Sequence, residues 1–536
     1  MSSANGRQDL SALGVQDLSA LGTQALVDPG KTPTDEQVRV IEAPRRPLLV
    51  VAGAGSGKTE TMSMRVLWLV ANHEDIAPSS VLGLTFTRKA AGELGDRLRQ
   101  RLALLAGRVP SLRERLDEDP VSLTYNSFAE RIVAEHGMRI GIDPDFTMLT
   151  EAGAVDLMTQ IVEGWPTDLD EDLSPSAAVG HCLHLAGEVG EHGYTVEEAR
   201  DALEGFGRDL EQIGATNDTA RKTLRANARR LAYLGPVEEF QRRKREGGLL
   251  DFSDQLVLAT RIVREAPAVR AQVRDEFQAV LLDEFQDTSV IQMELLSLLF
   301  HDHAVTAVGD PNQAIYGWRG ASASSLERFL DRFQDGPAQP GQTLTLSTAW
   351  RNDRNILRAA NRVAAPLREH SRAAKSPVLR ARPGAGEGRV DVAYTQDYRS
   401  ALGAVVDFVS AHRARGTREG KRPTTAVLCR RRSDFPYVDM ALREAGVPTQ
   451  IVGLGGLLDQ PSVQDARAAL VLADDVEASP WLARLLAGID LGAADLVALG
   501  DWARHLAREE GRDPHRAVLL DAVDNPPEPG WSASGG

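Results

Sequence analysis

Residues 48–59 read LLVVAGAGSGKT, and this stretch decides the expected fold of the chain. A short apolar run, typical of a buried strand, leads into a glycine-rich turn and then into Lys58 and Thr59. Apolar residues then recur at helical spacing, at Met62, Val66, Leu69 and Val70. Strand, loop and helix in this order are the setting in which such a loop binds phosphate.

The loop has the chemistry of a phosphate cradle. Glycines let successive backbone N–H groups turn toward a polyphosphate, and the N-terminus of the next helix adds its positive dipole end. Lys58 would reach the β and γ phosphates, and the Thr59 hydroxyl would ligate Mg²⁺. Ala52 takes the first glycine position of the general pattern. The residues expected to hold the nucleotide are Ala52, Gly53, Ala54, Gly55, Ser56, Gly57, Lys58 and Thr59. The alternative is a structural turn before a surface lysine.

Composition limits the classes of protein that fit. The 536 residues predict several domains, with 42% hydrophobic and 26% charged residues as in ordinary globular proteins. A net charge of -15 argues against a uniformly basic surface for nucleic acid, but basic runs at residues 241–245 and 430–432 allow a local basic track. Two distant cysteines predict no cysteine metal site and suit a reducing cytoplasm. No apolar run reaches transmembrane length, so we expect a cytoplasmic protein with no membrane partner.

Residues 279–288, AVLLDEFQDT, form a second centre of chemistry. Asp283 and Glu284 follow an apolar strand and should lie at its carboxyl end, where ligands of open α/β sheets bind. Asp283 can hold Mg²⁺, and Glu284 can orient and deprotonate the attacking water. The alternative, a solvated acidic loop, does not account for the strand before it or for the phosphate cradle.

A third polar segment follows the strand expected at residues 304–309, in the sequence DPNQAIYGWRGA. Gln313 would hydrogen-bond the γ-phosphate, while Tyr316, Trp318 and Arg319 would face a single nucleic-acid strand. Stacking contributes about 1–3 kcal/mol per base. A core position is the alternative for Trp318.

Residues 344–347 predict the start of a second α/β unit, which leads into Trp350 and Arg351. Arg351 precedes a helical pattern and is expected to point at the nucleotide from that unit. Further strands are expected at residues 390–394 and 425–430, with a helix at 402–412 between them. Upstream of the cradle, the amide of Gln37 is placed to read an adenine edge.

In this order, the motifs resemble the UvrD/PcrA/Rep class of superfamily 1 DNA helicases over about residues 33–465. The resemblance also includes residues 85–91, a strand-binding motif with Phe86, and residues 250–254. The chain departs from the family pattern at Asn126, Trp350, Ala349 and Glu60, where the family often has His, Tyr, Asn and Arg. Residues 447–458 are similar to the motor subunits of actinobacterial AdnAB-type end-resection machines.

The resemblance implies an α/β fold of two RecA-like P-loop domains with helical insertions, the second domain incomplete. The expected parts are a disordered tail (1–30), domain 1A (31–118 and 251–335), a helical subdomain 1B (119–250), a partial domain 2A (336–475) and the start of a helical domain 2B (476–536). The tail contains an imperfect repeat over residues 8–23, for which a short docking helix is the alternative.

The resemblance also implies an activity: an ATP- and Mg²⁺-dependent helicase or translocase, usually 3′ to 5′, acting on single-stranded and duplex DNA in repair or recombination. Lys58, Glu284, Gln313 and Arg351 would serve hydrolysis, Gln37 and Trp350 would bind adenine, Thr59 and Asp283 would hold the metal, and Phe86, Tyr316, Trp318 and Arg319 would contact DNA. A second subunit of a helicase–nuclease complex is an expected partner.

The family's motifs V and VI are not found, so we expect the amino-terminal part of a longer motor that binds ATP but hydrolyses it poorly. One alternative is a truncated or non-cycling DNA-binding subunit of a helicase–nuclease complex. Another is a P-loop small-molecule kinase, which leaves the second α/β unit unexplained.

Overall fold

The computed structural model describes residues 32–536 except for 110–112, 144–145, 168, 170–172, 215–216, 318–323, 335–340, 371–374, 415–422, 453–460, 490, 513, 515–516 and 528–536. The chain divides after Val390 into two compact units. The predicted N-terminal tail, Trp318, Arg319 and residues 453–458 lie outside the described residues.

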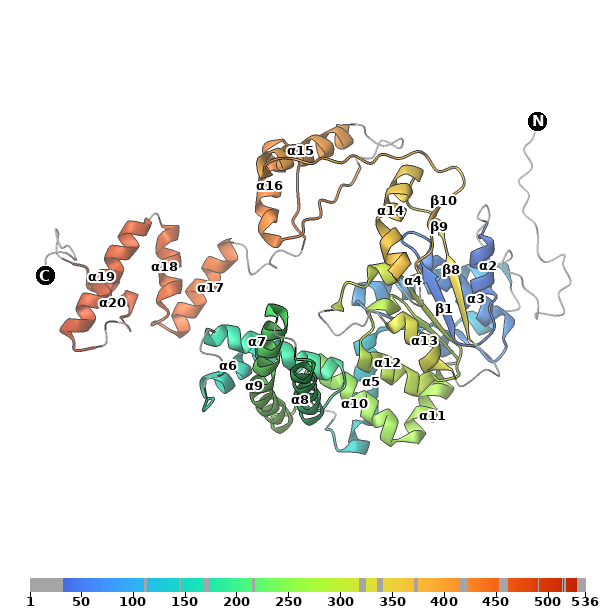
Figure 1. The fold of residues 1–536 in the computed structure, drawn as a ribbon, viewed down its shortest axis with the longest axis horizontal. Coiled ribbons are helices and arrows are strands. Elements are labelled where there is room, and N and C mark those ends of the chain that lie inside the picture. Colours follow the sequence, from blue (N-terminus) through green and yellow to red (C-terminus); the bar gives the residue numbers. More distant parts are fainter. Residues whose placement is uncertain are drawn as a thin grey trace. The chain divides into compact units, whose positions relative to one another are not determined.

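The first unit is built on a six-stranded parallel sheet, of which Figure 1 labels β1 and β8. The strand order is β3-β2-β6-β7-β1-β8. The strands are β1 (Leu48–Ala52), β2 (Val81–Thr85), β3 (Val121–Thr124), β6 (Ala279–Leu282), β7 (Val305–Gly309) and β8 (Gln342–Leu346). The predicted α/β class is therefore confirmed.

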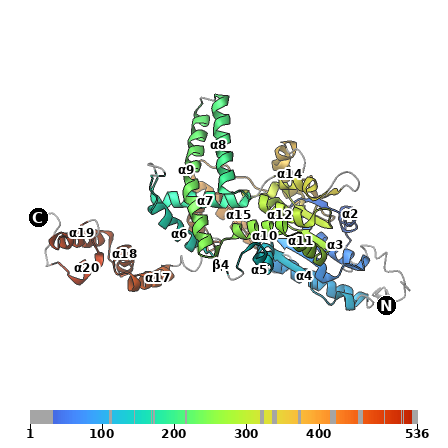
Figure 2. The same cartoon turned by 90° about the horizontal axis from the view of Figure 1, so that it is seen from below.

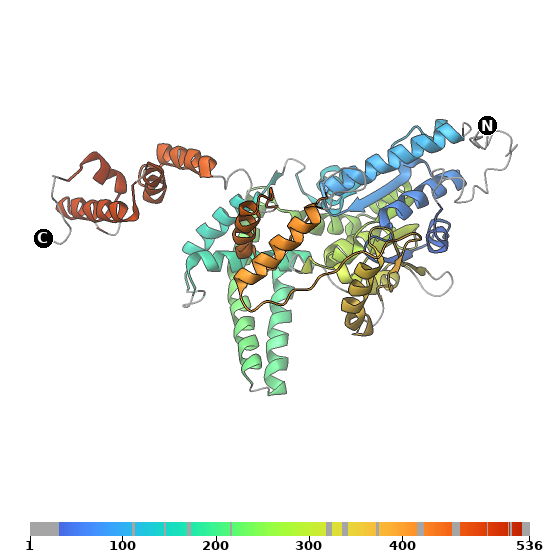
Figure 3. The same cartoon turned by 90° about the horizontal axis from the view of Figure 1, so that it is seen from above.

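Helices cover both faces of this sheet. Alternate residues of β1 enter opposite cores, since Leu49 and Val51 belong to one cluster and Leu48 and Val50 to the other. The first cluster includes α5 (Tyr125–His136), α10 (Phe252–Glu265), α11 (Pro267–Glu276), α12 (Val290–Phe300) and α13 (Ser325–Phe333); the second includes α2 (Asp35–Ile41), α3 (Lys58–Asn72) and α4 (Arg88–Arg108). Figure 3 shows α4 in light blue beside the sheet. Burial on both faces explains why the strands read as continuous apolar runs.

A helical insertion has its own core between α6 and α9. The helices are α6 (Glu151–Glu163), α7 (Pro175–Glu191), α8 (Val196–Ile213) and α9 (Asp218–Glu246), and Figure 2 shows α8 and α9 running side by side. At its base, β4 (Thr147–Met148) pairs in parallel with β5 (Leu249–Leu250).

Two elements that were predicted to open this helical subdomain belong instead to the sheet. Strand β3 pairs with β2, and Phe128 of α5 is buried in the sheet's core. Only alternate residues of β3, Val121 and Leu123, are apolar, so this edge strand gives a weak sequence signal.

The prediction that residues 344–347 start a second α/β unit is wrong. Strand β8 pairs in parallel with β1, from Leu48 beside Gln342 to Ala52 beside Leu346, and completes the first sheet. The chain leaves this sheet at Ser347 and forms a two-stranded pair of β9 (Thr348–Ala349) and β10 (Arg380–Ala381), with α14 (Arg354–His370) between them in sequence.

The second unit is helical in its described part. It contains α15 (Tyr398–Ala414), α16 (Phe435–Glu444), α17 (Pro461–Asp474), α18 (Ser479–Gly488), α19 (Ala493–Glu509) and α20 (Leu519–Asp524). The helix predicted at residues 402–412 is confirmed by α15. A small core joins α15 and α16 through Val409, Leu442 and Val447.

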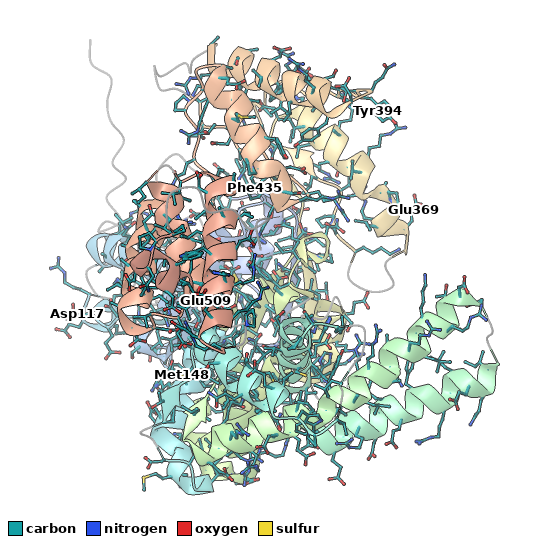
Figure 4. The ribbon with its side chains drawn as sticks, turned by 90° about the vertical axis from the view of Figure 1, so that its left-hand side faces the viewer. Asp117, Met148, Glu369, Tyr394, Phe435 and Glu509 are labelled. Atoms are coloured by element: carbon teal, nitrogen blue, oxygen red, sulfur yellow. The ribbon has the colours of Figure 1, made fainter. Side chains whose placement is uncertain are left out.

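The strands predicted at residues 390–394 and 425–430 are wrong, because these residues are described but form no strand. Tyr394, labelled in Figure 4, is fully exposed, and so, almost, is Leu428. An alternating apolar pattern becomes a strand only where a neighbouring strand pairs with it and covers its apolar face. Among the described helices, none has both the length and the apolar character needed to cross a bilayer.

Candidate functional site

The glycine-rich loop joins the end of β1 to the start of α3. Gly55 and Gly57 have φ of 73° and 82°, a left-handed backbone that favours glycine. At Gly53 a Cβ would meet the end of the Leu379 side chain, which would have to move to make room for it. Within the described structure, Ser56 Oγ is buried without a hydrogen-bond partner. The loop therefore has the backbone and an uncommitted polar group suited to an anion at the N-terminus of α3.

Lys58 and Glu284 meet at the centre of the site. Lys58 Nζ lies 2.7 Å from Glu284 Oε2, and the lysine side chain is only 12% exposed. Glu284 has φ of 50°, a strained value for a residue with a side chain. Gln286 Nε2 also donates to Glu284 Oε2 at 3.0 Å. The predicted loop lysine and strand-end carboxylate are thus brought together across 226 positions of sequence.

Asp283 fits the role of a metal ligand. Its Oδ1 is buried and has no hydrogen-bond partner among the described atoms. Burial, and next the negative charge of Glu284, raise the pKa of Asp283 to about 6. A cation would offset both effects, and carboxylate and hydroxyl oxygens are the ligands that Mg²⁺ prefers. Thr59 follows Lys58 in the first turn of α3, and its predicted role as a second metal ligand stays a prediction.

A hydrogen bond to Asp310 restrains the side chain of Gln313. Its Nε2 donates to Asp310 Oδ2 at 2.8 Å, and the backbone N–H of Asp310 donates to Gln286 Oε1 at 3.0 Å. Since Gln286 also contacts Glu284, a hydrogen-bonded chain runs from the acidic pair to Gln313. The predicted contact of Gln313 with a γ-phosphate stays a prediction.

Three further predicted nucleotide residues gather at the loop. Gln37 is buried and donates to Thr61 Oγ1 at 3.2 Å. A Cβ at Gly57 would lie 3.2 Å from Gln37 Nε2 and 3.6 Å from Trp350 Cδ1. Trp350 donates its backbone N–H to Gly55 O at 2.8 Å. Arg351 follows, its Cβ 3.0 Å from the Cβ position of Gly55. Arg351 was expected to approach from a separate unit, but it lies in the same compact unit as the loop.

An aromatic surface, formed by Phe86 and Tyr316, lies near Asp283. The rings of Phe86 and Tyr316 are parallel within 2°, with centroids 6.0 Å apart. Tyr125 packs against Phe86 at 5.1 Å and donates its hydroxyl to Asp283 O at 3.0 Å. A cavity of about 410 Å³ opens beside Phe86 and Tyr125, and its lining also includes Arg88 and Asp287. Two of the four residues predicted to contact DNA are thus adjacent.

A model of the UvrD/REP helicase N-terminal domain matches residues 33–334, more than half of the chain. The chain belongs to the UvrD/REP helicase family. The acidic pair, the loop and Gln37 all fall inside the matched residues, whereas Trp350 and Arg351 follow them.

Curated relatives in this family carry helicase names. The chain is 26% identical to DNA helicase II of Haemophilus influenzae over 492 residues, which cover 92% of the chain and 60% of that protein. It is 28% identical to DNA helicase II of Escherichia coli over 440 residues, covering 82% and 54%. It is 28% identical to ATP-dependent DNA helicase UvrD2 of Mycobacterium tuberculosis over 500 residues, covering 92% and 64%. The chain spans between about half and two thirds of the length of these relatives.

Some site residues of this UvrD/REP chain were not predicted. Asp310, which orders Gln313, follows the end of β7 just as Asp283 follows β6, and that parallel could have revealed it. Glu60, a departure from the family pattern, forms an ion pair with Arg101 and so has a structural partner. Asn126, another departure, accepts a hydrogen bond from Gln292 Nε2 at 3.2 Å.

Proposed function

We propose that this chain is the motor part of an ATP-dependent DNA helicase or translocase, which hydrolyses ATP in response to single-stranded DNA. The observation that carries the proposal is the meeting of Lys58 and Glu284 beside the uncommitted oxygen of Asp283. The names of the relatives support the choice of DNA as substrate. Movement from 3′ to 5′, use in repair or recombination, and a second RecA-like domain are parts of the same proposal.

The ion pair suggests how hydrolysis begins. Lys58 and Glu284 neutralise one another, so phosphates must draw Lys58 away before Glu284 can act. Glu284 then faces water as an unpaired carboxylate, the state in which it can accept a proton. Gln286 keeps its hydrogen bond to Glu284 and holds the carboxylate in place. Asp283 and Thr59 would hold Mg²⁺, which when bound supplies positive charge to the phosphates.

Hydrogen bonds connect this chemistry to the aromatic surface. Gln286 Nε2 donates to both Glu284 and Asp287, at 3.0 Å in each case. Asp287 Oδ1 accepts the backbone N–H of Ile315 at 3.1 Å, next to Tyr316. A base stacked on Tyr316 and Phe86 would restrain this segment and, through Gln286, the orientation of Glu284. DNA stimulation follows from that connection.

The deciding experiment is phosphate release from ATP with and without single-stranded DNA. We expect release to depend on DNA and to be lost in Glu284→Gln. The matched control is Glu265→Gln, because Glu265 is an exposed partner of Arg261 on α10 and should have little effect. Phosphate transfer to a small-molecule acceptor, with no response to DNA, would instead identify a kinase.

Two expectations about the chain's surroundings stay predictions. These are the second subunit of a helicase–nuclease complex and the cytoplasmic location. Co-purification of the chain with a nuclease subunit would test the first.

A further inference from the structure

Helix α2 contacts the nucleotide loop and the segment that carries Arg351 at the same time. Two adjacent residues make these contacts. Gln37 lies beside Gly57 and donates to Thr61 at the start of α3. Glu36 reaches instead across 311 positions of sequence to Ser347.

The contact between Glu36 and Ser347 uses both carboxylate oxygens. The backbone N–H of Ser347 donates to Glu36 Oε2 at 2.7 Å, and Ser347 Oγ donates to Oε1 at 2.7 Å and to Oε2 at 3.0 Å. Ser347 is 6% exposed. Hydrogen bonds to a charged acceptor are the stronger kind, and burial strengthens them further. Glu36 therefore fixes the backbone at Ser347.

Ser347 is the point at which the chain turns from the sheet toward the nucleotide loop. Immediately before it, Leu346 O accepts the backbone N–H of Gly53 at 3.3 Å. Three residues after it, Trp350 donates to Gly55 O, and Arg351 follows against Gly55. The position of Ser347 thus helps to determine where Arg351 lies against the nucleotide loop.

Helix α2 is itself anchored to the central sheet, so it can hold Ser347 in a fixed position. Arg65 is fully buried, and its Nη1 donates to the carbonyl oxygens of Val40, Ile41 and Ala43 at 2.9, 3.2 and 2.8 Å. Its Nε donates to Thr306 Oγ1 on β7 at 2.8 Å. The C-terminal end of α2 is therefore tied to the central sheet.

We propose that Glu36 is a positioning residue that holds Arg351 at the phosphate loop through Ser347. It joins the helix that carries Gln37 to the segment that carries Arg351. The residue that would bind adenine and the residue that would bind the γ-phosphate are thereby held in a fixed relative position. This inference rests on the proposed function, in which Arg351 senses the γ-phosphate.

The test compares ATP with ADP, because only ATP has the phosphate that Arg351 would reach. Titration calorimetry on the full chain would give both dissociation constants for the unaltered protein and for Glu36→Ala. We expect Glu36→Ala to weaken ATP binding about tenfold, as for a lost hydrogen bond to a charged group, and ADP binding by less than about threefold. Glu36→Gln keeps an acceptor of the same length and should recover most of the ATP affinity.

A second comparison identifies the residue through which Glu36 acts. In Arg351→Ala, we expect the added change Glu36→Ala to cause no further loss of ATP affinity. Ser347→Ala, which removes only the hydroxyl, should give a smaller loss than Glu36→Ala. Asp35→Asn is the matched control, since Asp35 is an exposed neighbour on the same turn of α2.

Two results would overturn the inference. Equal losses of ATP and ADP affinity in Glu36→Ala would show that Glu36 only stabilises α2, the helix that carries Gln37. Additive losses in the double variant would show that it acts apart from Arg351. Failure of the unaltered chain to bind ATP at all would instead reject the proposed function.

Discussion

The nucleotide side and the aromatic side of the sheet's carboxyl edge are built from opposite chemistry. On the nucleotide side, Lys58, Asp283 and Glu284 bring full charges into a largely covered space. On the aromatic side, the partly buried rings of Phe86 and Tyr316 stack on one another beside the buried Tyr125, and the neighbouring cavity is also lined by charged side chains such as Arg88 and Glu130. Charge is suited to phosphate and aromatic rings to bases, so under the proposed function the two sides would bind different ligands.

One segment of the chain connects the two sides. Residues 283–287 contribute to both, because Asp283 O accepts the hydroxyl of Tyr125 and Asp287 accepts the backbone of Ile315. Substitutions on one side should therefore have a large local effect and a smaller effect on the other side. The four predictions below test that separation, from the largest expected effect to the smallest.

Glu284→Gln should have the largest effect, and on turnover alone. Loss of a general base lowers the rate by about 10²–10⁴. ATP affinity should be kept or improved, since Lys58 no longer has a competing carboxylate. Single-turnover phosphate release and equilibrium ATP titration measure the two quantities. Turnover within threefold of the unaltered chain would show that Glu284 is not the base.

Lys58→Ala should lower ATP turnover by about 10²–10³, the effect of removing one charge-stabilising group. Affinity for single-stranded DNA should stay within about twofold, because Lys58 contacts the acidic pair and not the aromatic rings. Fluorescence anisotropy with labelled single-stranded DNA measures the second quantity. A parallel loss of DNA affinity would break the separation of the two sides.

Asp283→Asn should stabilise the protein when Mg²⁺ and nucleotide are left out. The folded protein raises the pKa of Asp283 from 3.8 to about 6, so folding favours the protonated form. This group therefore makes stability fall as pH rises from about 4 to 6, with a full cost of at most about 3 kcal/mol above pH 6. Asparagine cannot ionise and should remove that cost.

Urea unfolding of Asp283→Asn and of the unaltered chain at pH 5 and pH 7 checks this expectation. The difference in the free energy of unfolding should be larger at pH 7. Mg²⁺-dependent ATP hydrolysis should be lost in the same variant. If Asp283→Asn were no more stable than the unaltered chain at pH 7, ionisation of the buried Asp283 would not destabilise the fold.

Phe86→Ala should weaken binding of single-stranded DNA by about 1–3 kcal/mol, the contribution of one stacked base. Basal ATP hydrolysis should change little, and the DNA-stimulated part should fall. Phe206→Ala on α8 is the control, because Phe206 is an exposed aromatic residue remote in sequence from the motifs. Equal losses of basal and stimulated activity would show that Phe86 is a packing residue instead.

Features coded by neighbouring residues were predictable from the sequence. The loop from Ala52 to Thr59 follows its strand directly, and Asp283 and Glu284 follow theirs, so local order alone placed them at the edge of a sheet. The helical patterns after Arg351 and near Leu402 were equally local.

Features that depend on distant partners were not predictable. Strand β8 pairs with β1 and not with a second sheet, and the sequence of β8 does not indicate which strand it pairs with. The contact of Glu36 with Ser347 spans most of the first unit. Residues 390–394 and 425–430 have the apolar pattern of strands, but strand pairing depends on a neighbouring strand that the pattern itself does not contain.

The left-handed backbone at Glu284 has a consequence for engineering. Glycine or asparagine would adopt a φ of 50° more comfortably, so selection for heat resistance alone would favour replacing this carboxylate. Such a screen is expected to yield variants that are more thermostable but do not hydrolyse ATP. Position 284 should therefore be kept unchanged when this chain is engineered for stability.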